Sequence, residues 1–140
     1  MNNNYGIDIW SDGNFIIEDG LAKVNHDCKP SLISIVKDIR KQDFKGPLLL
    51  RFPHITNKQI TTLFDTFNAS IKEYDYKGTF SAVFPLKVNQ LPNFVHPLVS
   101  IGKKYNYGLE AGSKAELIIA MTYNTIGSPI TINGFKDKEM

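Results

Sequence analysis

Residues 80–133 read FSAVFPLKVNQLPNFVHPLVSIGKKYNYGLEAGSKAELIIAMTYNTIGSPITIN, and in this stretch short apolar segments alternate with segments of helical character. The pattern predicts three strands and two helices, in the order 80–88 (strand), 94–104 (helix), 107–111 (strand), 115–121 (helix) and 129–133 (strand). The order β-α-β-α-β is typical of a parallel sheet covered by helices. The spacing of Ser113 and Glu116 predicts a capping box at the start of the second helix.

The residues before this stretch have a different pattern. Short apolar runs at 5–10, 15–17 and 21–24 are separated by Asp-Gly turns, which predicts an N-terminal β-meander. A helical period follows at 31–42, and an apolar run at 48–52 predicts a buried strand. The last element before residue 80 is a long helix, which Thr56 and Gln59 are expected to cap and which runs to about Tyr74.

The strand count indicates a larger fold. Three parallel strands leave one face or both edges of a sheet uncovered, and no helical segment follows the strand at 129–133. The sequence therefore predicts the opening of a larger α/β fold.

The composition excludes several classes of protein. With 140 residues and 42% hydrophobic content, the chain can form a packed core, and disorder is not expected. Apolar runs such as 117–121 are far shorter than the roughly 18 residues of a membrane-spanning helix, and residues 1–5 do not resemble a signal peptide. Cys28 has no partner for a disulfide within the chain, so a cytoplasmic protein is expected. The 16 basic residues are interspersed with 14 acidic ones, so no nucleic-acid partner is expected.

Polar residues follow each predicted parallel strand, at 87–90, 110–114 and 133–137. Ligands of parallel α/β folds bind at these carboxyl ends. Lys87 follows an apolar segment, and a partly desolvated lysine can supply the neutral amine that Schiff-base chemistry needs. From spacing alone, the favoured interpretation of Lys87 is a strand-end lysine whose amine reaches solvent. Glu110 could orient such an amine or could be a solvated strand-end carboxylate.

Other kinds of site have little support. His26, His54 and His96 are far apart in sequence and lack neighbouring ligands at metal-binding spacing. No glycine-rich phosphate loop of standard spacing is present. Cys28 lies in a polar segment and is interpreted as an incidental thiol.

Three blocks resemble the biosynthetic arginine decarboxylases of bacteria. The first is 74–78 running into 83–90 (VFPLKVNQ), the second is 107–117 (YGLEAGSKAEL), and the third is 132–139 (INGFKDKE). The blocks occur in the family's order and spacing. The family's chains are several times longer, so this chain resembles their N-terminal portion.

The resemblance implies a fold and a chemistry. The family uses pyridoxal 5′-phosphate (PLP) in a (β/α)₈ barrel, the TIM-barrel architecture, with a second β-rich domain. Residues 1–52 would contribute to the β-rich domain, and residues 53–140 would form the opening part of the barrel. Lys87 matches the lysine that holds PLP as a Schiff base, and Glu110 is a candidate for positioning Lys87 or the cofactor. The reaction would be decarboxylation of L-arginine to agmatine and CO₂, in polyamine (spermidine) biosynthesis, with Mg²⁺ as a further cofactor of the family.

The resemblance also implies what residues 1–140 lack. In this fold type, the residues that bind phosphate, stack on the cofactor ring and select arginine come from later strands and from the second domain. They often lie across a dimer interface, so a homo-oligomer is expected, and the 140-residue piece alone is expected to be inactive. Two alternatives stay open, namely a non-catalytic truncated fragment and another PLP-dependent barrel decarboxylase or racemase.

Overall fold

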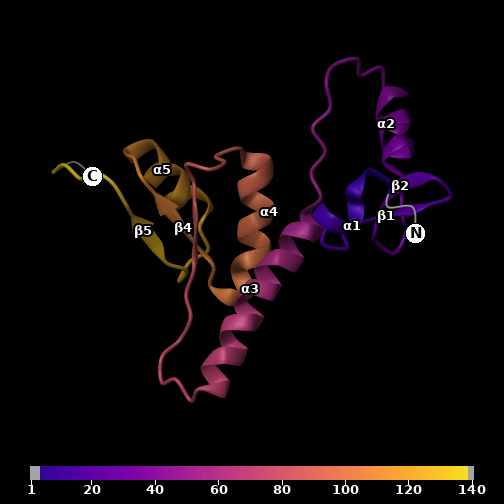
Figure 1. The fold of residues 1–140 in the computed structure, drawn as a ribbon. Helices are drawn as coiled ribbons and strands as arrows, with labels where there is room; N and C mark the ends of the chain where they lie inside the picture. Colours follow the sequence, from indigo (N-terminus) through magenta and orange to yellow (C-terminus); the bar gives the residue numbers. More distant parts are fainter. Residues whose placement is uncertain (1–3, 139–140) are drawn as a thin grey trace. The chain divides into compact units, whose positions relative to one another are not determined.

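The computed structural model describes residues 4–138 of the chain (Figure 1). The chain divides into two compact units, Met1–Arg51 and Phe52–Met140. Residues 1–3, on which the signal-peptide argument partly rests, and Glu139, the last residue of the third resemblance block, lie outside the described residues. Within the described residues, no helix is both long enough and apolar enough to cross a membrane.

The first unit is built around an antiparallel hairpin. Strands β1 (Phe15–Glu18) and β2 (Leu21–Val24) pair with Phe15 opposite Val24 and Glu18 opposite Leu21. The turn between them is the predicted Asp-Gly turn, and both of its residues have positive φ, 55° at Asp19 and 72° at Gly20. This conformation matches the twist of paired strands, which explains the tight two-residue connection. Helix α2 (Leu32–Arg40) follows, and the Ser31 hydroxyl caps it by accepting a hydrogen bond from the Ser34 amide at 3.1 Å.

The prediction of a three-stranded meander is wrong at its first strand. Residues 4–10 form a short 3₁₀ segment, η1 (Asn4–Gly6), and one turn of helix, α1 (Ile7–Trp10). Positive φ at Tyr5 and Gly6 prevents an extended chain. The Trp10 indole Nε1 donates to the Tyr5 carbonyl at 3.0 Å and holds the coiled conformation. The alternation of apolar and polar residues over 5–10 predicts a strand, because a sequence pattern does not show a local hydrogen bond of this kind.

The apolar run at 48–52 does not form the predicted strand either. No strand is assigned there, and the Leu49 side chain is 74% exposed. The run lies between Pro47 and Pro53, which have no amide hydrogen to donate to a ladder. Pro53 is instead the first residue of helix α3 (Pro53–Glu73), where its fixed φ and missing donor are tolerated. Thr56 and Gln59 therefore lie inside the helix and do not cap it.

The second unit contains the predicted parallel sheet. Strands β3 (Val83–Pro85), β4 (Gly108–Ala111) and β5 (Ile130–Ile132) pair in the order β3-β4-β5, and both pairings are parallel. The connections contain helices α4 (Pro92–Gly102) and α5 (Lys114–Tyr123), and a 3₁₀ segment, η2 (Lys103–Tyr105), precedes β4. The β-α-β-α-β prediction and the α/β fold class are confirmed, and this sheet agrees with the opening of a barrel.

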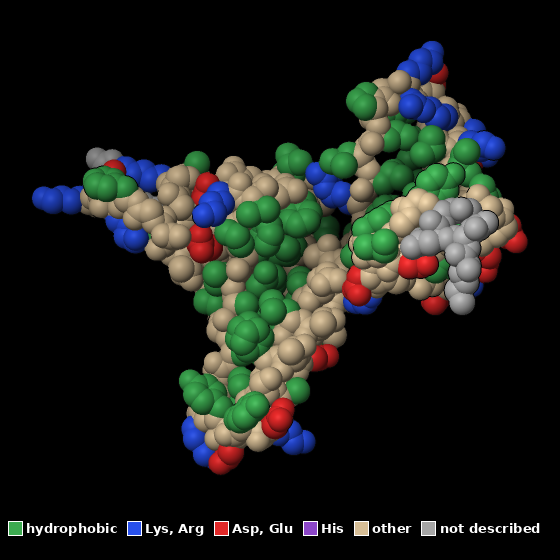
Figure 2. Space-filling view, viewed as in Figure 1, with side chains coloured by type: hydrophobic (Ala, Val, Ile, Leu, Met, Phe, Trp, Pro, Cys, Tyr) green, Lys and Arg blue, Asp and Glu red, His purple; other side chains and the backbone are tan. Residues whose placement is uncertain are grey.

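The core of the second unit lies between the sheet and the helices. Leu86, Leu109 and Ala111 from the strands are fully buried, together with Val95 of α4 and Ala120 of α5. Burying a leucine side chain stabilises a fold by about 1.5–3 kcal/mol, so these positions fix the helix-facing side of the sheet. Figure 2 shows that hydrophobic side chains also reach the surface of this unit around α4. Val88, just beyond β3, is 67% exposed.

Helix α4 begins two residues earlier than predicted, and Pro97 is inside it. A proline there removes one intrahelical hydrogen bond and weakens the helix. Val95, Leu98 and Val99 are all buried in the same turn, so tertiary packing offsets the loss.

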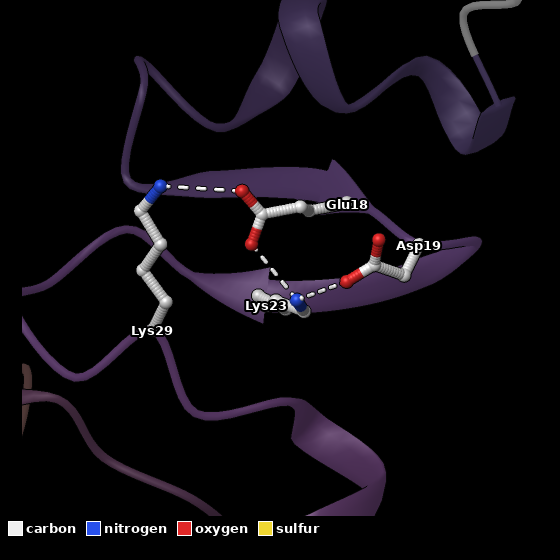
Figure 3. A network of polar contacts seen from close by, with 4 residues as sticks. All are labelled: Glu18, Asp19, Lys23 and Lys29. Carbon is white, nitrogen blue, oxygen red and sulfur yellow. Dashed lines mark hydrogen bonds and ion pairs between the residues drawn. The ribbon is translucent and has the colours of Figure 1, made fainter.

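A network of charges connects the two strands of the first unit (Figure 3). The Lys23 ammonium contacts Glu18 at 2.8 Å and Asp19 at 2.9 Å, and Lys29 contacts the other oxygen of Glu18 at 3.3 Å. The Lys23 side chain is only 15% exposed. Hydrogen bonds from Lys23 and Lys29 lower the pKa of Glu18, and hydrogen bonds to Glu18 and Asp19 raise the pKa of Lys23.

We expect the hairpin to become less stable at acid pH because of this network. A carboxylate whose pKa is lowered by folding contributes stability above its unfolded pKa, here near 4.5, and loses it as pH falls through the folded pKa. The raised pKa of Lys23 gives a second contribution that is lost as pH rises above about 10.5. Hydrogen exchange of the Ile16 and Lys23 backbone amides, which face each other across the hairpin, measures the acid effect between pH 3 and 7; the effect is expected to be small. Glu18→Gln should abolish most of it, and an unchanged pH dependence in that variant would contradict the assignment.

Candidate functional site

The carboxyl ends of the parallel strands meet at one edge of the sheet. The register pairs Pro85 with Glu110 and Glu110 with Thr131, so these three residues lie side by side on one face. Beyond the strands, the Leu86 amide donates to the Glu110 carbonyl and the Asn133 amide donates to the Ala111 carbonyl, both at 2.9 Å. The fold therefore brings together the three polar segments that follow the predicted strands.

Lys87 lies in a turn that directly follows β3. The predicted strand at 80–88 is shorter in the structure because the Val88 amide donates back to the Pro85 carbonyl at 3.1 Å and closes residues 86–88 into a turn. The Lys87 side chain is exposed. Its amine has no hydrogen-bond or ion-pair partner among residues 4–138, so it is accessible to a ligand at the strand end.

Two other lysines near this edge differ from Lys87. The Lys114 amine pairs with the Asp137 carboxylate at 2.7 Å, and the Lys136 amine donates to the Gly134 carbonyl at 3.0 Å. Both amines are engaged in these contacts, which makes them less available to a ligand than the Lys87 amine. Lys87 is therefore the best placed of the three for covalent chemistry.

Glu110 lies on the sheet face opposite the helix-covered core. Its neighbours in β4, Leu109 and Ala111, are fully buried against the helices, whereas Glu110 is half-buried on the other face. The side-chain Nδ2 of Asn133 donates to Glu110 Oε1 at 3.4 Å, so the carboxylate lies between β4 and the end of β5. Glu110 and Lys87 thus occupy the ends of neighbouring strands.

Glu116 has a role that the sequence analysis missed. The predicted cap is confirmed, since the Glu116 amide donates to Ser113 Oγ at 3.3 Å. The Glu116 carboxylate, however, accepts hydrogen bonds from the Gly112 amide at 2.6 Å and from the Gln90 side chain at 3.1 Å. In the sequence, Gln90 is only one of the polar residues that follow the predicted strand at 80–88. The capping-box spacing indicated the helix start, but no sequence signal joined residues 26 positions apart.

The remaining candidate features do not join this site. A hollow of about 320 Å³ is lined by residues that include Phe64, Lys104 and Tyr105. Its lining includes neither Lys87 nor Glu110, and Phe80 and Asn106 place it toward the amino ends of β3 and β4. Within residues 4–138, no group of three or more His, Cys, Asp or Glu side chains could hold a metal ion.

The chain is similar in sequence to enzymes of one kind. It is 39% identical to the biosynthetic arginine decarboxylase of Tolumonas auensis over 144 residues, which cover 96% of this chain and 22% of that protein. It is 45% identical to the biosynthetic arginine decarboxylase of Gloeobacter violaceus over 109 residues, which cover 77% of this chain and 17% of that protein. No family model matches the chain.

A solved structure resembles the chain more closely. The crystal structure of the biosynthetic arginine decarboxylase SpeA from Campylobacter jejuni superimposes with a TM-score of 0.94 at 60% sequence identity. The match covers 97% of this chain and 23% of that one. The chain thus spans less than a quarter of the length of the relatives it matches, and their sequences and fold confirm the resemblance that the three blocks predict.

Proposed function

We propose that this chain, which is related to an N-terminal portion of the biosynthetic arginine decarboxylases, contributes the cofactor-binding lysine of a PLP-dependent enzyme that converts L-arginine to agmatine and CO₂. The observation that carries the proposal is the position of Lys87. Its amine is exposed and unengaged within the described residues, at the carboxyl end of a parallel strand, in the block that resembles the cofactor site of that family. Agmatine formation would serve polyamine biosynthesis.

The residues at the strand ends fit a covalently held aldehyde cofactor. Lys87 offers a primary amine on a flexible side chain at the edge where parallel α/β folds bind ligands. Bound PLP would supply an electron sink for the bond that breaks when CO₂ leaves. The groups that would hold its phosphate and ring are expected from other parts of the enzyme.

Two side chains of this chain have proposed roles in the reaction. The Lys87 amine would hold the cofactor covalently, and when it is free it can carry a proton at Nζ. The Glu110 carboxylate, held by Asn133, lies on the neighbouring strand and orients Lys87 or the cofactor. We assign no step to Mg²⁺, because residues 4–138 offer no cluster of metal ligands.

The proposal extends to the partners of the whole enzyme. L-Arginine is the proposed substrate, because the relatives are named for that reaction. A homo-oligomer with active sites at a dimer interface is proposed from the resemblance. The division at about residue 52, between a contribution to a β-rich domain and the opening of a barrel, is proposed on the same ground.

The substrate proposal predicts a ranking of amino acids. We expect the enzyme that contains this chain to decarboxylate L-arginine with a kcat/KM at least about 100-fold above the values for L-ornithine, L-lysine and diaminopimelate. A site that hydrogen-bonds a substrate group rejects analogues lacking that group by large factors. Steady-state CO₂ release with PLP present measures the four constants. A preference for ornithine, or release from none of the four, would contradict the proposal.

A further inference from the structure

Glu116 is a carboxylate that is almost completely buried, since its residue is only 9% exposed. Removing a carboxylate from water is costly unless hydrogen bonds compensate. Each oxygen has one donor here: the Gly112 amide bonds to Oε2 at 2.6 Å, and Gln90 Nε2 bonds to Oε1 at 3.1 Å. Hydrogen bonds to an ionised acceptor are among the stronger ones in proteins, so this arrangement fixes both donors.

Gln90 belongs to the segment that carries Lys87. Two hydrogen bonds of this segment are local: the Val88 amide donates to the Pro85 carbonyl, and the Leu91 amide donates to Asn89 Oδ1 at 3.1 Å. Two others reach a different element. The Leu86 amide, before Lys87, donates to the Glu110 carbonyl of β4 at 2.9 Å, and the Gln90 side chain, after Lys87, donates to Glu116 in the first turn of α5. Figure 1 shows α5 directly after β4, the strand that neighbours β3.

We infer that the Gln90–Glu116 hydrogen bond positions Lys87 relative to the end of β4, which makes Gln90 and Glu116 positioning residues of the proposed active site. The inference rests on the proposed function of Lys87. A helix cap alone does not account for the arrangement, because Ser113 already caps α5 and the Gln90 side chain belongs to a different loop. With this bond and the bond from the Leu86 amide to the Glu110 carbonyl both intact, the segment that carries Lys87 is held on either side of the lysine.

Exchanging the two side chains tests the inference. In Glu116→Gln, the new oxygen can still accept from the Gly112 amide, and the Gln90 side chain can turn so that its oxygen accepts from the new Nε2, so a weaker, neutral hydrogen bond replaces the bond to the carboxylate. In Gln90→Glu, two carboxylates face each other across about the same 3.1 Å contact. In the double variant Gln90→Glu/Glu116→Gln, the amide at position 116 can donate to the carboxylate at position 90, and its oxygen can still accept from the Gly112 amide. The double variant therefore restores the bond with its polarity reversed.

Three measurements on the enzyme that contains this chain are informative. Gln90→Glu is expected to lower kcat for L-arginine by about tenfold to a hundredfold, with KM changed less than about threefold, because misplacing a reacting group by about 1 Å can cost a factor of this size. Glu116→Gln, which keeps a neutral hydrogen bond, is expected to lower kcat less. Hydrogen exchange at the Val88 amide should speed up by about tenfold in Gln90→Glu. The rate of reductive methylation of Lys87 in Gln90→Glu should differ from that of the original protein; it is measured by mass spectrometry of the Lys87 peptide in the PLP-free protein, because bound PLP would occupy the amine. The double variant should return all three quantities to within about threefold of the original enzyme.

The matched control is Gln42→Glu, which makes the same chemical change at an exposed glutamine of the first unit and should alter none of the three quantities. A Gln90→Glu variant that leaves kcat and Val88 exchange unchanged would overturn the inference, as would a double variant no better than Gln90→Glu alone. If the unaltered enzyme does not act on L-arginine, while exchange and methylation still respond to Gln90→Glu and recover in the double variant, the proposed function fails and the hydrogen bond's control of Lys87 stands.

Discussion

Replacement of Lys87 by alanine is expected to abolish covalent attachment of PLP to the enzyme that contains this chain and to lower its turnover by at least about a thousandfold. A methyl group cannot form the covalent link, and losing a residue that acts covalently removes most of the rate enhancement. Lys87→Arg should fail to the same extent, because a guanidinium stays protonated and cannot replace a neutral amine. The absorbance of the PLP-loaded protein and the rate of CO₂ release from L-arginine measure the two effects.

Two neighbouring lysines provide the controls for this prediction. Lys114 is engaged with Asp137, and Lys136 with the Gly134 carbonyl, so their alanine variants should bind PLP and turn over at rates near that of the unaltered enzyme. Borohydride reduction of the PLP-loaded enzyme should attach the pyridoxyl group to the peptide that contains Lys87. A label on Lys114 or Lys136 would overturn both the role of Lys87 and the use of this strand end as the active site.

The parallel half of the fold was predictable because periodicity and chain order agree there. Apolar strands flanked by turns alternate with segments of helical period from residue 80 onward, and a crossover connection between neighbouring strands makes them parallel. The fully buried Leu109 and Ala111 lie in the strand expected at 107–111. Only the limits of the elements differ, because Pro85 is followed by a turn and Pro92 begins a helix.

The N-terminal part was less predictable because single local contacts decide its conformation. The Trp10 indole bond to the Tyr5 carbonyl makes a helical turn from residues whose alternation favours a strand. The run at 48–52 is apolar enough for a strand but has prolines on both sides. In both places the hydrophobic pattern is short, and a specific hydrogen bond or a missing donor outweighs it.

The candidate site shows the same division. Lys87 and Glu110 could be chosen from the sequence because each follows or ends an apolar strand and lies in a block with a family resemblance. The second role of Glu116 could not, because its carboxylate reaches Gln90 only after β3 and β4 have paired. A contact of this kind depends on the register of two strands, which the sequence alone does not specify.

Gly108→Ala is expected to have the largest effect on the stability of the second unit. Gly108 is buried at the start of β4, and a Cβ atom there would lie 1.9 Å from the Pro129 carbonyl oxygen and 2.8 Å from its carbonyl carbon. Both are backbone atoms that also position the bond from the Leu109 amide to the Pro129 carbonyl at 3.1 Å. Relief of the clash requires β4 and β5 to separate at this point. Overpacking of this kind typically lowers the free energy of unfolding by about 1–3 kcal/mol, and we expect Gly108→Ala to lower it by an amount at or above the upper end of this range.

Hydrogen exchange and a matched substitution make the Gly108 prediction testable. The Leu109 and Asn133 amides, which bond across the β4–β5 pair, should exchange at least about a hundredfold faster in Gly108→Ala, since 3 kcal/mol corresponds to slightly more than two factors of ten. The matched control is Gly46→Ala in the first unit, where a Cβ atom meets only the Phe44 ring, a side chain that can move aside, at 3.1 Å. In Gly46→Ala, the Leu109 and Asn133 amides should exchange at rates near those of the original protein. Unchanged protection of Leu109 and Asn133 in Gly108→Ala would mean that β5 does not pair with β4 in the described register, and the third strand end would then be removed from the candidate site.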